Sequence, residues 1–330
     1  MTIQDPEHYV TGVLNRDNLA LARTITLIES TLPAHQELAR TVVDRLLPRT
    51  GRSIRIGITG IPGSGKSTFI ERFGTMLTGL GHRVAVLAID PSSSRSGGSI
   101  LGDKTRMEKL AVDPNAFIRP SPSRGTLGGV GRRTRETMLV CEAAGYDVVI
   151  IETVGVGQSE TTVASMVDFF LVLMIAGAGD ELQGIKRGVL EVADAIVINK
   201  ADGDNLARVE MARKDYQAAL NMLMPSSPNW SPPVLTCSSV EGTGIDTIWK
   251  TILDHHDKLT ACGEIAEKRK TQDLEWMAFL LDDGLRQWFY TSPHVQEALP
   301  RLRKNVEEKK ISPTAAADSL LAFLHDRNGE

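Results

Sequence analysis

The chain has 330 residues, of which 42% are hydrophobic and 24% are charged, and its formal net charge is −4. This length predicts one large domain with appendages, or two domains, and the slightly acidic balance argues against a nucleic-acid partner. Three scattered cysteines and the lack of an apolar run of about 18 residues argue against a disulfide framework, a cysteine zinc cluster and a membrane partner, so we expect a protein of the reducing cytoplasm.

Residues 1–50 are expected to form an N-terminal helical extension. Apolar residues lie near helical spacing from Leu14 to Ile28 and again from Leu38 to Leu47. The Leu32-Pro33 pair interrupts the pattern between these two stretches. We therefore expect a helical hairpin here.

Residues 51–255 have the alternating texture of an α/β domain. Most of their short apolar runs lack polar alternation, as strands buried on both faces of a parallel sheet do. Helical stretches, such as 67–81 and 132–145, lie between several of the runs, so we expect a doubly wound and mostly parallel sheet. The expected strands are 54–60, 83–90, 116–120, 146–153, 168–175, 194–200 and 233–239.

Residues 256–330 are expected to form a charged, helical C-terminal arm. Apolar residues between Leu274 and Trp288 fall on one helical face, and Ser312-Pro313 is a typical helix start. This arm has too little core to fold alone. It should pack on the α/β domain or on a second copy of the chain.

A nucleotide-binding loop follows the first expected strand. The stretch GIPGSGKST matches the pattern G-x-x-x-x-G-K-[ST] between a strand and a helix, which is the context that a P-loop requires. Its glycines let successive N–H groups point at phosphate oxygens, Lys66 reaches the β- and γ-phosphates, and Ser67 offers a hydroxyl to Mg²⁺. The expected contacts are Gly60, Ile61, Pro62, Gly63, Ser64, Gly65, Lys66, Ser67 and Thr68.

The sequence NKAD at the end of a later strand predicts guanine recognition. Asp202 can accept hydrogen bonds from both N1–H and the 2-amino group of guanine, a donor pair that adenine does not have. Lys200 can lay its aliphatic stem along the base, and Asn199 can tie this loop to the P-loop. A third base-contacting turn is expected at Ser238, Ser239 and Val240. Together these features favour GTP and GDP over adenine nucleotides.

Carboxylates at strand ends predict the magnesium side of the site. Glu152 ends a buried strand in the sequence Glu-Thr-Val-Gly, where most GTPases have Asp-x-x-Gly, and Asp90 ends another strand. The N–H of Gly155 is expected near the γ-phosphate, which would make residues 153–160 a switch. Asp103 is either a further metal-site carboxylate or a helix N-cap.

Taken together, the stretches GIPGSGKST, AIDPSSSRSGGSILGDKTRM, SPSRGTLGG, ETVGVGQSE, GAGDELQGIKRG and NKAD resemble the MeaB/ArgK GTPases, which are P-loop GTPases of the SIMIBI class. The resemblance spans residues 51–255, and the helical ends also suit it. It implies a homodimeric GTPase that accompanies the adenosylcobalamin-dependent methylmalonyl-CoA mutase, gates cofactor loading and protects the mutase. It further implies a low intrinsic GTPase activity that the mutase stimulates, and a cobalamin adenosyltransferase is a further candidate partner.

One departure from the wider class concerns catalysis. Relatives that act across a dimer often carry a lysine early in the P-loop, where this chain has Ile61-Pro62, so the cation for hydrolysis must come from elsewhere. Gln158 could orient water. In the segment 176–187, Gln183 and Lys186 are either catalytic groups of an additional switch, as the resemblance implies, or polar residues of an ordinary helix start.

Two other functions are weighed against a mutase chaperone. A P-loop kinase acting on a protein, such as a component of a transport system, is disfavoured by NKAD, because guanine selection is unusual in metabolic kinases. A metallochaperone GTPase is disfavoured because the seven histidines are scattered and form no ligand-rich tract.

Overall fold

The computed structural model describes residues 4–90, 107–122, 127–153, 159–177, 187–223 and 227–324. The chain forms two compact units, Met1–Gln272 and Asp273–Glu330. No helix in the described ranges is both long enough and apolar enough to cross a membrane.

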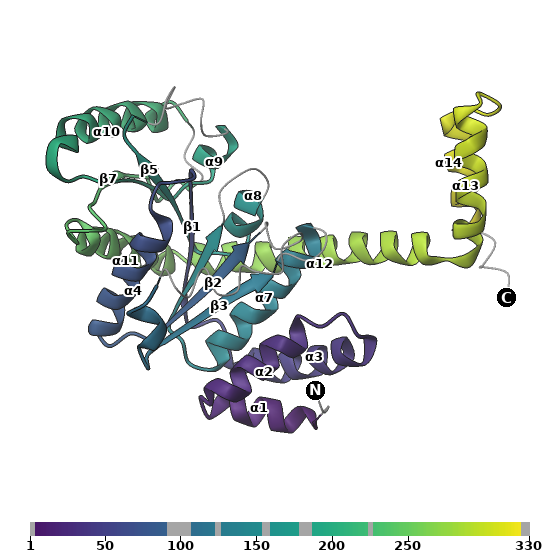
Figure 1. The fold of residues 1–330 in the computed structure, drawn as a ribbon, viewed down its shortest axis with the longest axis horizontal. Helices are drawn as coiled ribbons and strands as arrows, with labels where there is room; N and C mark the ends of the chain where they lie inside the picture. Colours follow the sequence, from purple (N-terminus) through teal and green to yellow (C-terminus); the bar gives the residue numbers. More distant parts are fainter. Residues whose placement is uncertain are drawn as a thin grey trace. The chain divides into compact units, whose positions relative to one another are not determined.

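The first unit is built on a seven-stranded sheet in the order β3-β2-β4-β1-β5-β6-β7 (Figure 1). Every neighbouring pair in this sheet is parallel, which confirms the α/β fold class. Strands β4 and β6 are buried along their whole length, as their unbroken apolar sequences predict. The strands are β1 (Ile54–Gly60), β2 (Val84–Asp90), β3 (Ala116–Pro122), β4 (Val148–Thr153), β5 (Phe169–Ile175), β6 (Ala195–Asn199) and β7 (Val234–Thr236).

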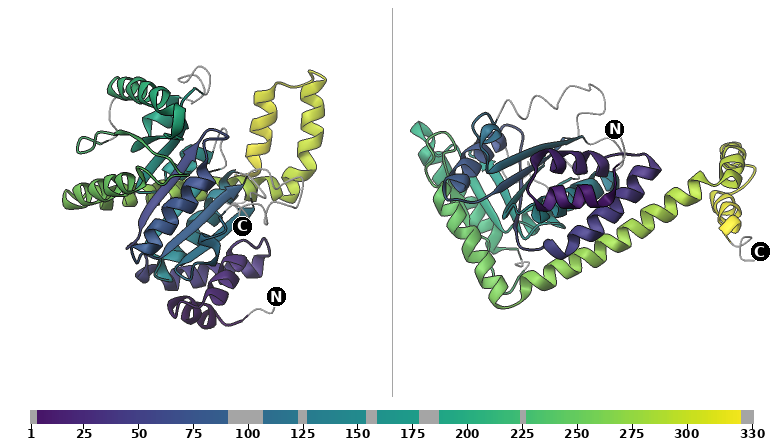
Figure 2. Two further views of the ribbon diagram at one scale, coloured as in Figure 1. Left: turned by 60° about the vertical axis from the view of Figure 1, so that its left-hand side comes forward. Right: turned by 90° about the horizontal axis from the view of Figure 1, so that it is seen from below.

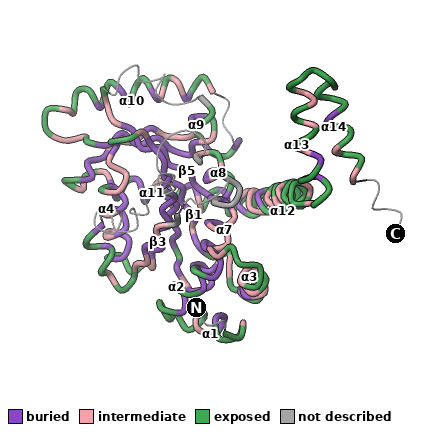
Figure 3. Tube along the Cα trace, turned by 45° about the vertical axis from the view of Figure 1, so that its right-hand side comes forward, coloured by how far each residue is buried: buried purple, intermediate pink, exposed green. Residues whose placement is uncertain are grey.

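Helices cover both faces of the sheet, and a separate hydrophobic cluster fills each face. Helices α4 (Lys66–Gly79) and α11 (Ile245–Ala261) pack on one face, while α7 (Leu127–Ala143), α8 (Ser159–Ala164), α9 (Arg187–Glu191) and α10 (Leu206–Asn221) pack on the other. Figure 3 shows the buried strands between helices whose outer sides are exposed. Short 3-10 turns lie at Leu47–Arg49, Leu110–Val112, Gly203–Asn205 and Ala322–Leu324.

The N-terminal region contains three helices, so the expected hairpin of two helices is wrong. They are α1 (Pro6–Leu14), α2 (Asn18–Ile28) and α3 (Pro33–Leu46), and they lie together beside α7 (Figure 2). The first expected helix is broken because Arg16 has a left-handed φ of 63° and the Asp17 carboxylate caps α2 at the N–H of Leu19, 2.8 Å away. Hydrophobic spacing alone did not reveal this capped break.

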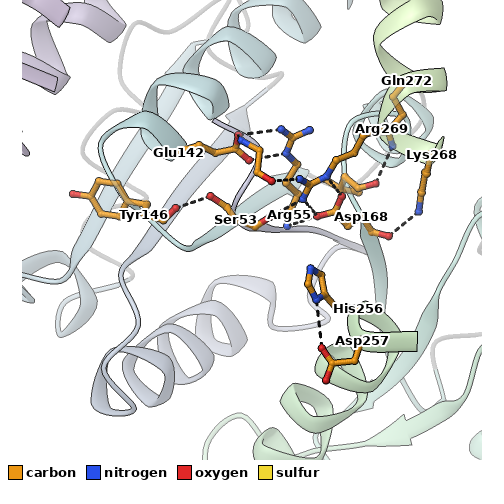
Figure 4. A network of polar contacts seen from close by, with 12 residues as sticks. Ser53, Arg55, Glu142, Tyr146, Asp168, His256, Asp257, Lys268, Arg269 and Gln272 are labelled. Carbon is orange, nitrogen blue, oxygen red and sulfur yellow. Dashed lines mark hydrogen bonds and ion pairs between the residues drawn. The ribbon is translucent and has the colours of Figure 1, made fainter. Parts of the chain in front are cut away.

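A buried polar network holds the beginning of α12 (Glu264–Thr291) against the amino ends of β1 and β5 (Figure 4). The Arg269 guanidinium forms an ion pair of 2.6 Å with Asp168, and Lys268 donates to the Asp168 carbonyl oxygen at 2.7 Å. Arg55 on β1 pairs with Glu142 on α7 at 2.7 Å. Burial raises the pKa of Asp168, but hydrogen bonding and charge from Arg269, helped by Arg55, outweigh burial and lower that pKa below its ordinary value.

The second unit contains the rest of α12, together with α13 (Pro293–Glu307) and α14 (Pro313–Leu321). The expected helix start at Ser312 is confirmed, because its hydroxyl accepts a 3.1 Å hydrogen bond from the N–H of Ala315. Along α12 five large apolar side chains of the face expected from the sequence remain exposed in the described chain. They are Leu274, Met277, Leu281, Leu285 and Trp288.

Candidate functional site

The P-loop motif forms a tight turn between β1, which ends at Gly60, and α4, which begins at Lys66. Gly63 and Gly65 have left-handed φ values of 79° and 87°, a conformation that glycine adopts at little cost. A Cβ atom on Gly65 would lie only 2.8 Å from the side-chain nitrogen of Asn199. The turn therefore requires glycine for both conformation and space, and it leads into a helix N-terminus suited to phosphate.

Lys66 lies inside this turn. Its Nζ donates to the carbonyl oxygens of Gly60 at 2.7 Å and Ile61 at 3.3 Å. Burial lowers the pKa of Lys66, although the negative charges of Glu152 and Glu160 act in the opposite direction. An ammonium group is thus held at the phosphate end of the site by two carbonyl oxygens of the loop.

The remaining P-loop residues surround this lysine. Ser67 is half-buried in the first turn of α4, whereas Thr68 in the same turn is exposed. Pro62 and Gly63 are exposed at the outer edge of the loop, and Ser64 is buried beneath it.

Two of the expected metal ligands, Asp90 and Glu152, lie on the neighbouring strands β2 and β4, and Ser67 lies in the first turn of α4. Glu152 on β4 lies level with Ile58 of β1 and Ala88 of β2, and Asp90 is the last residue of β2. Glu152 is buried, and it acts electrostatically on Lys66. The Glu152 carboxylate and the Ser67 hydroxyl are oxygen donors of the kind that Mg²⁺ prefers, so these two residues are chemically suited to the expected metal.

Asn199 joins the base end of the site to the P-loop. Its Nδ2 donates to the Ser64 carbonyl oxygen at 2.8 Å, while its Oδ1 accepts from the N–H of Ser239 at 3.1 Å and from the Ser239 hydroxyl at 2.8 Å. Three segments far apart in the sequence therefore meet at one buried amide. This is the linking role that the motif predicts for Asn199.

Asp202 and its neighbours form the turn expected to read the base. The Ser238 hydroxyl donates a short hydrogen bond to Oδ2 of Asp202, which fixes the orientation of that carboxylate. Lys200 has a left-handed φ of 62°, and Val240 is 78% exposed at the rim. Ser238 thus contributes here by orienting Asp202.

Five of the expected site residues lie outside the described residues: Asp103, Gly155, Gln158, Gln183 and Lys186. Their flanks are described. The Thr153 hydroxyl donates to the Thr59 hydroxyl at 2.7 Å, which holds the end of β4 against β1 directly before residues 154–158. Gly177, with a φ of 77°, turns the chain just after β5, and α9 begins at Arg187.

Sequence reasoning missed two residues that the fold brings to this site. Glu160, in the first turn of α8, acts electrostatically on Lys66. Arg72 on α4 donates to the Glu241 carbonyl oxygen at 3.3 Å and so supports the turn after β7. Glu160 is the last residue of the expected switch 153–160 and could have been suspected, whereas the Arg72 contact depends on tertiary structure alone.

Comparisons with known proteins agree with this geometry. Residues 21–294 match the family model of MeaB, the methylmalonyl Co-A mutase-associated GTPase. A putative GTPase of Caulobacter vibrioides is 60% identical over 93% of this chain and 94% of its own length. The mitochondrial methylmalonic aciduria type A homolog of Mus musculus is 46% identical over 96% of this chain and 79% of its own length.

A solved structure is similar over nearly the whole chain. The crystal structure of a LAO/AO transport system kinase superposes with a TM-score of 0.79 and 41% sequence identity, covering 98% of this chain and all of that one. The sheet order, the P-loop and the family match point in the same direction. The chain therefore belongs to the MeaB family and is a P-loop GTPase.

Proposed function

We propose that this GTPase serves an adenosylcobalamin-dependent methylmalonyl-CoA mutase as a chaperone that gates cofactor loading and protects the mutase from inactivation. The match of residues 21–294 to a family described as mutase-associated is the observation that carries this proposal. The name of the mouse relative, which refers to methylmalonic aciduria, supports it. We place this activity in the cytoplasm, and a cobalamin adenosyltransferase is a second candidate partner.

In this proposal the P-loop residues bind the phosphates, and the turns after β6 and β7 bind guanine. Lys66 holds the β- and γ-phosphates, and its closeness to Gly60 and Ile61 places its ammonium group within the loop. Asp202 accepts from the two guanine donors, with its carboxylate oriented by Ser238. Asn199, Lys200, Ser239 and Val240 complete the base side.

The proposed Mg²⁺ site uses Ser67, Asp90, Asp103 and Glu152, and Mg²⁺ would supply charge neutralisation at the phosphates. Two features support it: the oxygen donors of Ser67 and Glu152, and the adjacency of β2, which ends at Asp90, and β4, which carries Glu152. The N–H of Gly155 is proposed to face the γ-phosphate.

Hydrolysis is proposed to depend on the partner. The P-loop has Ile61-Pro62 where some relatives have a lysine, so Lys66 is the cation that this loop provides. We propose that Gln158 orients the attacking water, and that Gln183 and Lys186 complete the site when the mutase docks. A stabilising cation supplied in this way raises rates by about 10³–10⁵-fold in other GTPases.

A homodimer is part of the same proposal. The exposed apolar side chains of α12 form a stripe along this helix, and the stripe is open to solvent in the described chain. Such a stripe is typical of a helix that packs against a partner. We propose a second copy of the chain as that partner, bound through the arm of residues 256–330.

A protein kinase is the second candidate, because the solved structure with a TM-score of 0.79 carries the name of a transport system kinase. The two functions differ in where the γ-phosphoryl group goes. A GTPase transfers it to water and releases inorganic phosphate, whereas a kinase leaves it on a hydroxyl, imidazole or carboxylate of an acceptor protein. GTP labelled at the γ-phosphate, incubated with the chain and mutase, should give labelled phosphate and leave the proteins unlabelled.

The chaperone role is tested by following mutase activity over many turnovers. With GTP and the chain present, the mutase should lose activity several-fold more slowly than it does alone. The variant Lys66→Ala, which removes the phosphate-binding cation, should give no protection. Equal inactivation rates with and without the wild-type chain would rule out a protective role.

A further inference from the structure

Asn205 occupies the N-cap position of α10 but does not cap this helix. Asparagine at this position usually accepts a hydrogen bond from an N–H group in the first helical turn. Within the described part of the chain the Asn205 side chain makes no such bond. Its Nδ2 instead donates to the carbonyl oxygen of Lys200 at 2.8 Å, five residues back along the chain.

The main chain of Asn205 forms a second hydrogen bond to the turn between Lys200 and Asp202. Its N–H donates to the carbonyl oxygen of Asp202 at 3.1 Å. Asn205 thus donates two hydrogen bonds, one to the carbonyl oxygen of Lys200 and one to that of Asp202. The two acceptors flank the stretch of main chain that leads from Lys200 to Asp202. This fixes the local path of the chain that carries the Asp202 carboxylate.

The turn needs such support because its backbone is unfavourable. Lys200 has a left-handed φ of 62°, a backbone conformation that costs a non-glycine residue free energy. It persists only where interactions with the surrounding structure offset that cost. Asp202 follows in an extended conformation, with φ −142° and ψ 164°. Ser238 orients the Asp202 side chain, but that hydrogen bond does not restrain Lys200.

We propose that Asn205 is a positioning residue for guanine selection: it holds the Lys200–Asp202 turn so that the Asp202 carboxylate meets both donors of the guanine edge. The inference rests on the proposed role of Asp202 in base recognition. Asn205 itself is not proposed to touch the nucleotide. Its effect is on how well the site distinguishes guanine from a base with one donor fewer.

Hypoxanthine is the probe for this role, because it keeps the N1–H donor and lacks the 2-amino group of guanine. The dissociation constants for GDP and IDP are measured for the wild type, Asn205→Ala and Asn205→Asp. The wild type should bind GDP more tightly than IDP. In Asn205→Ala the Kd for GDP should rise about 10-fold and that for IDP about 3-fold, because GDP has two contacts to lose.

Asn205→Asp separates positioning from helix capping. Aspartate caps helices as well as asparagine does, and its charge is favourable at a helix N-terminus, so a capping role predicts unchanged binding. A carboxylate cannot donate to the Lys200 carbonyl oxygen and would face it with like partial charge. The positioning role therefore predicts that Asn205→Asp loses at least as much GDP affinity and selectivity as Asn205→Ala.

Asn221→Ala is the matched control, since this asparagine lies at the other end of α10 and is exposed, where it accepts a hydrogen bond from Gln217. Its nucleotide constants should equal those of the wild type. Melting temperatures within about 3 °C of the wild type show that the Asn205 variants are folded.

An unchanged ratio of IDP to GDP affinity in folded Asn205→Ala or Asn205→Asp would overturn the inference and leave guanine recognition intact. A wild type that binds GDP and IDP equally would overturn both the inference and the proposed role of Asp202.

Discussion

The side-chain amide of Asn199 donates a 2.8 Å hydrogen bond to the carbonyl oxygen of Ser64, and so connects the end of β6 to the P-loop. The same amide accepts two hydrogen bonds from Ser239. Because Asn199 is only 2% exposed, water cannot replace these partners easily. The phosphate end and the base end of the site are thus connected through the hydrogen bonds of one buried side chain.

Substitution Asn199→Ala should damage nucleotide binding through both ends of the site. Loss of the amide leaves the Ser64 carbonyl and the Ser239 N–H without this partner, at about 1–3 kcal/mol for each buried group. We expect the Kd for GDP to rise about 10- to 100-fold in a fluorescent-nucleotide titration. Asn221→Ala, an exposed change on α10, should leave the Kd unaltered, and a wild-type Kd in Asn199→Ala would show that the bridge is dispensable.

The ion pair between Arg269 and Asp168 should matter for stability. Asp168 is buried, and Arg269→Ala would leave its charge without its closest cation. Removing one member of a buried pair costs about 3–5 kcal/mol, so urea denaturation at pH 7 should show a loss of that size. The control is Lys270→Ala at the next residue, which breaks an exposed ion pair with Glu267. It should change the free energy of unfolding by about 0–1 kcal/mol.

The cost of Arg269→Ala should depend on pH. In the wild type the pKa of Asp168 is lowered, so its contribution is present above about pH 4 and is lost as pH falls below that value. In the variant, burial without Arg269 should raise that pKa above its unfolded value, and protonation then relieves the unpaired charge. The difference between variant and wild type should therefore shrink between about pH 7 and pH 4. A difference that is constant over this range would show that Asp168 is not the group responsible.

Lys186→Ala should separate nucleotide binding from stimulated hydrolysis. The P-loop and the turns after β6 and β7 account for binding without this residue, so the Kd for GDP should stay at the wild-type value. Mutase-stimulated GTP turnover should be lost, because the proposed cation is gone. Lys109→Ala, in an exposed position before the 3-10 turn at Leu110–Val112, should leave both unchanged. Full stimulation in Lys186→Ala would remove this residue from the mechanism.

The exposed apolar stripe of α12 should control self-association. Leu281→Lys combined with Leu285→Lys places two charges on the stripe and should shift the chain from dimer to monomer in sedimentation equilibrium. Glu275→Lys, an exposed polar position on the same helix, should leave the dimer intact. A dimer that survives the double substitution would place the interface elsewhere.

The sheet was predictable because its strands are buried on both faces. The runs 148–153 and 169–175 lack the alternation of polar and apolar residues that marks a strand with one face in solvent. All seven expected strands are present. The break at Arg16 and Asp17 was not predictable from hydrophobic spacing, because a capped turn leaves that spacing nearly unchanged.

The site was predictable only as far as local motifs define it. Lys66 and Asn199 belong to short sequence patterns, and the linking role expected of Asn199 agrees with its contacts. Asn205 and Arg72 have no such pattern around them. The partner of Arg72 depends on how separate segments approach in space, which a single sequence does not record. Asn205 bonds to Lys200 only five residues away, but this bond depends on the left-handed turn at Lys200, which no local pattern marks.

The most direct test of partner-dependent hydrolysis is the rate of phosphate release from GTP with increasing amounts of purified methylmalonyl-CoA mutase. Lys66→Ala serves as the inactive control. We expect a low rate for the chain alone and at least a 10-fold rise at saturating mutase, since the partner completes a site short of a cation. A rate that is the same with and without mutase, at concentrations where the two proteins form a complex, would contradict it.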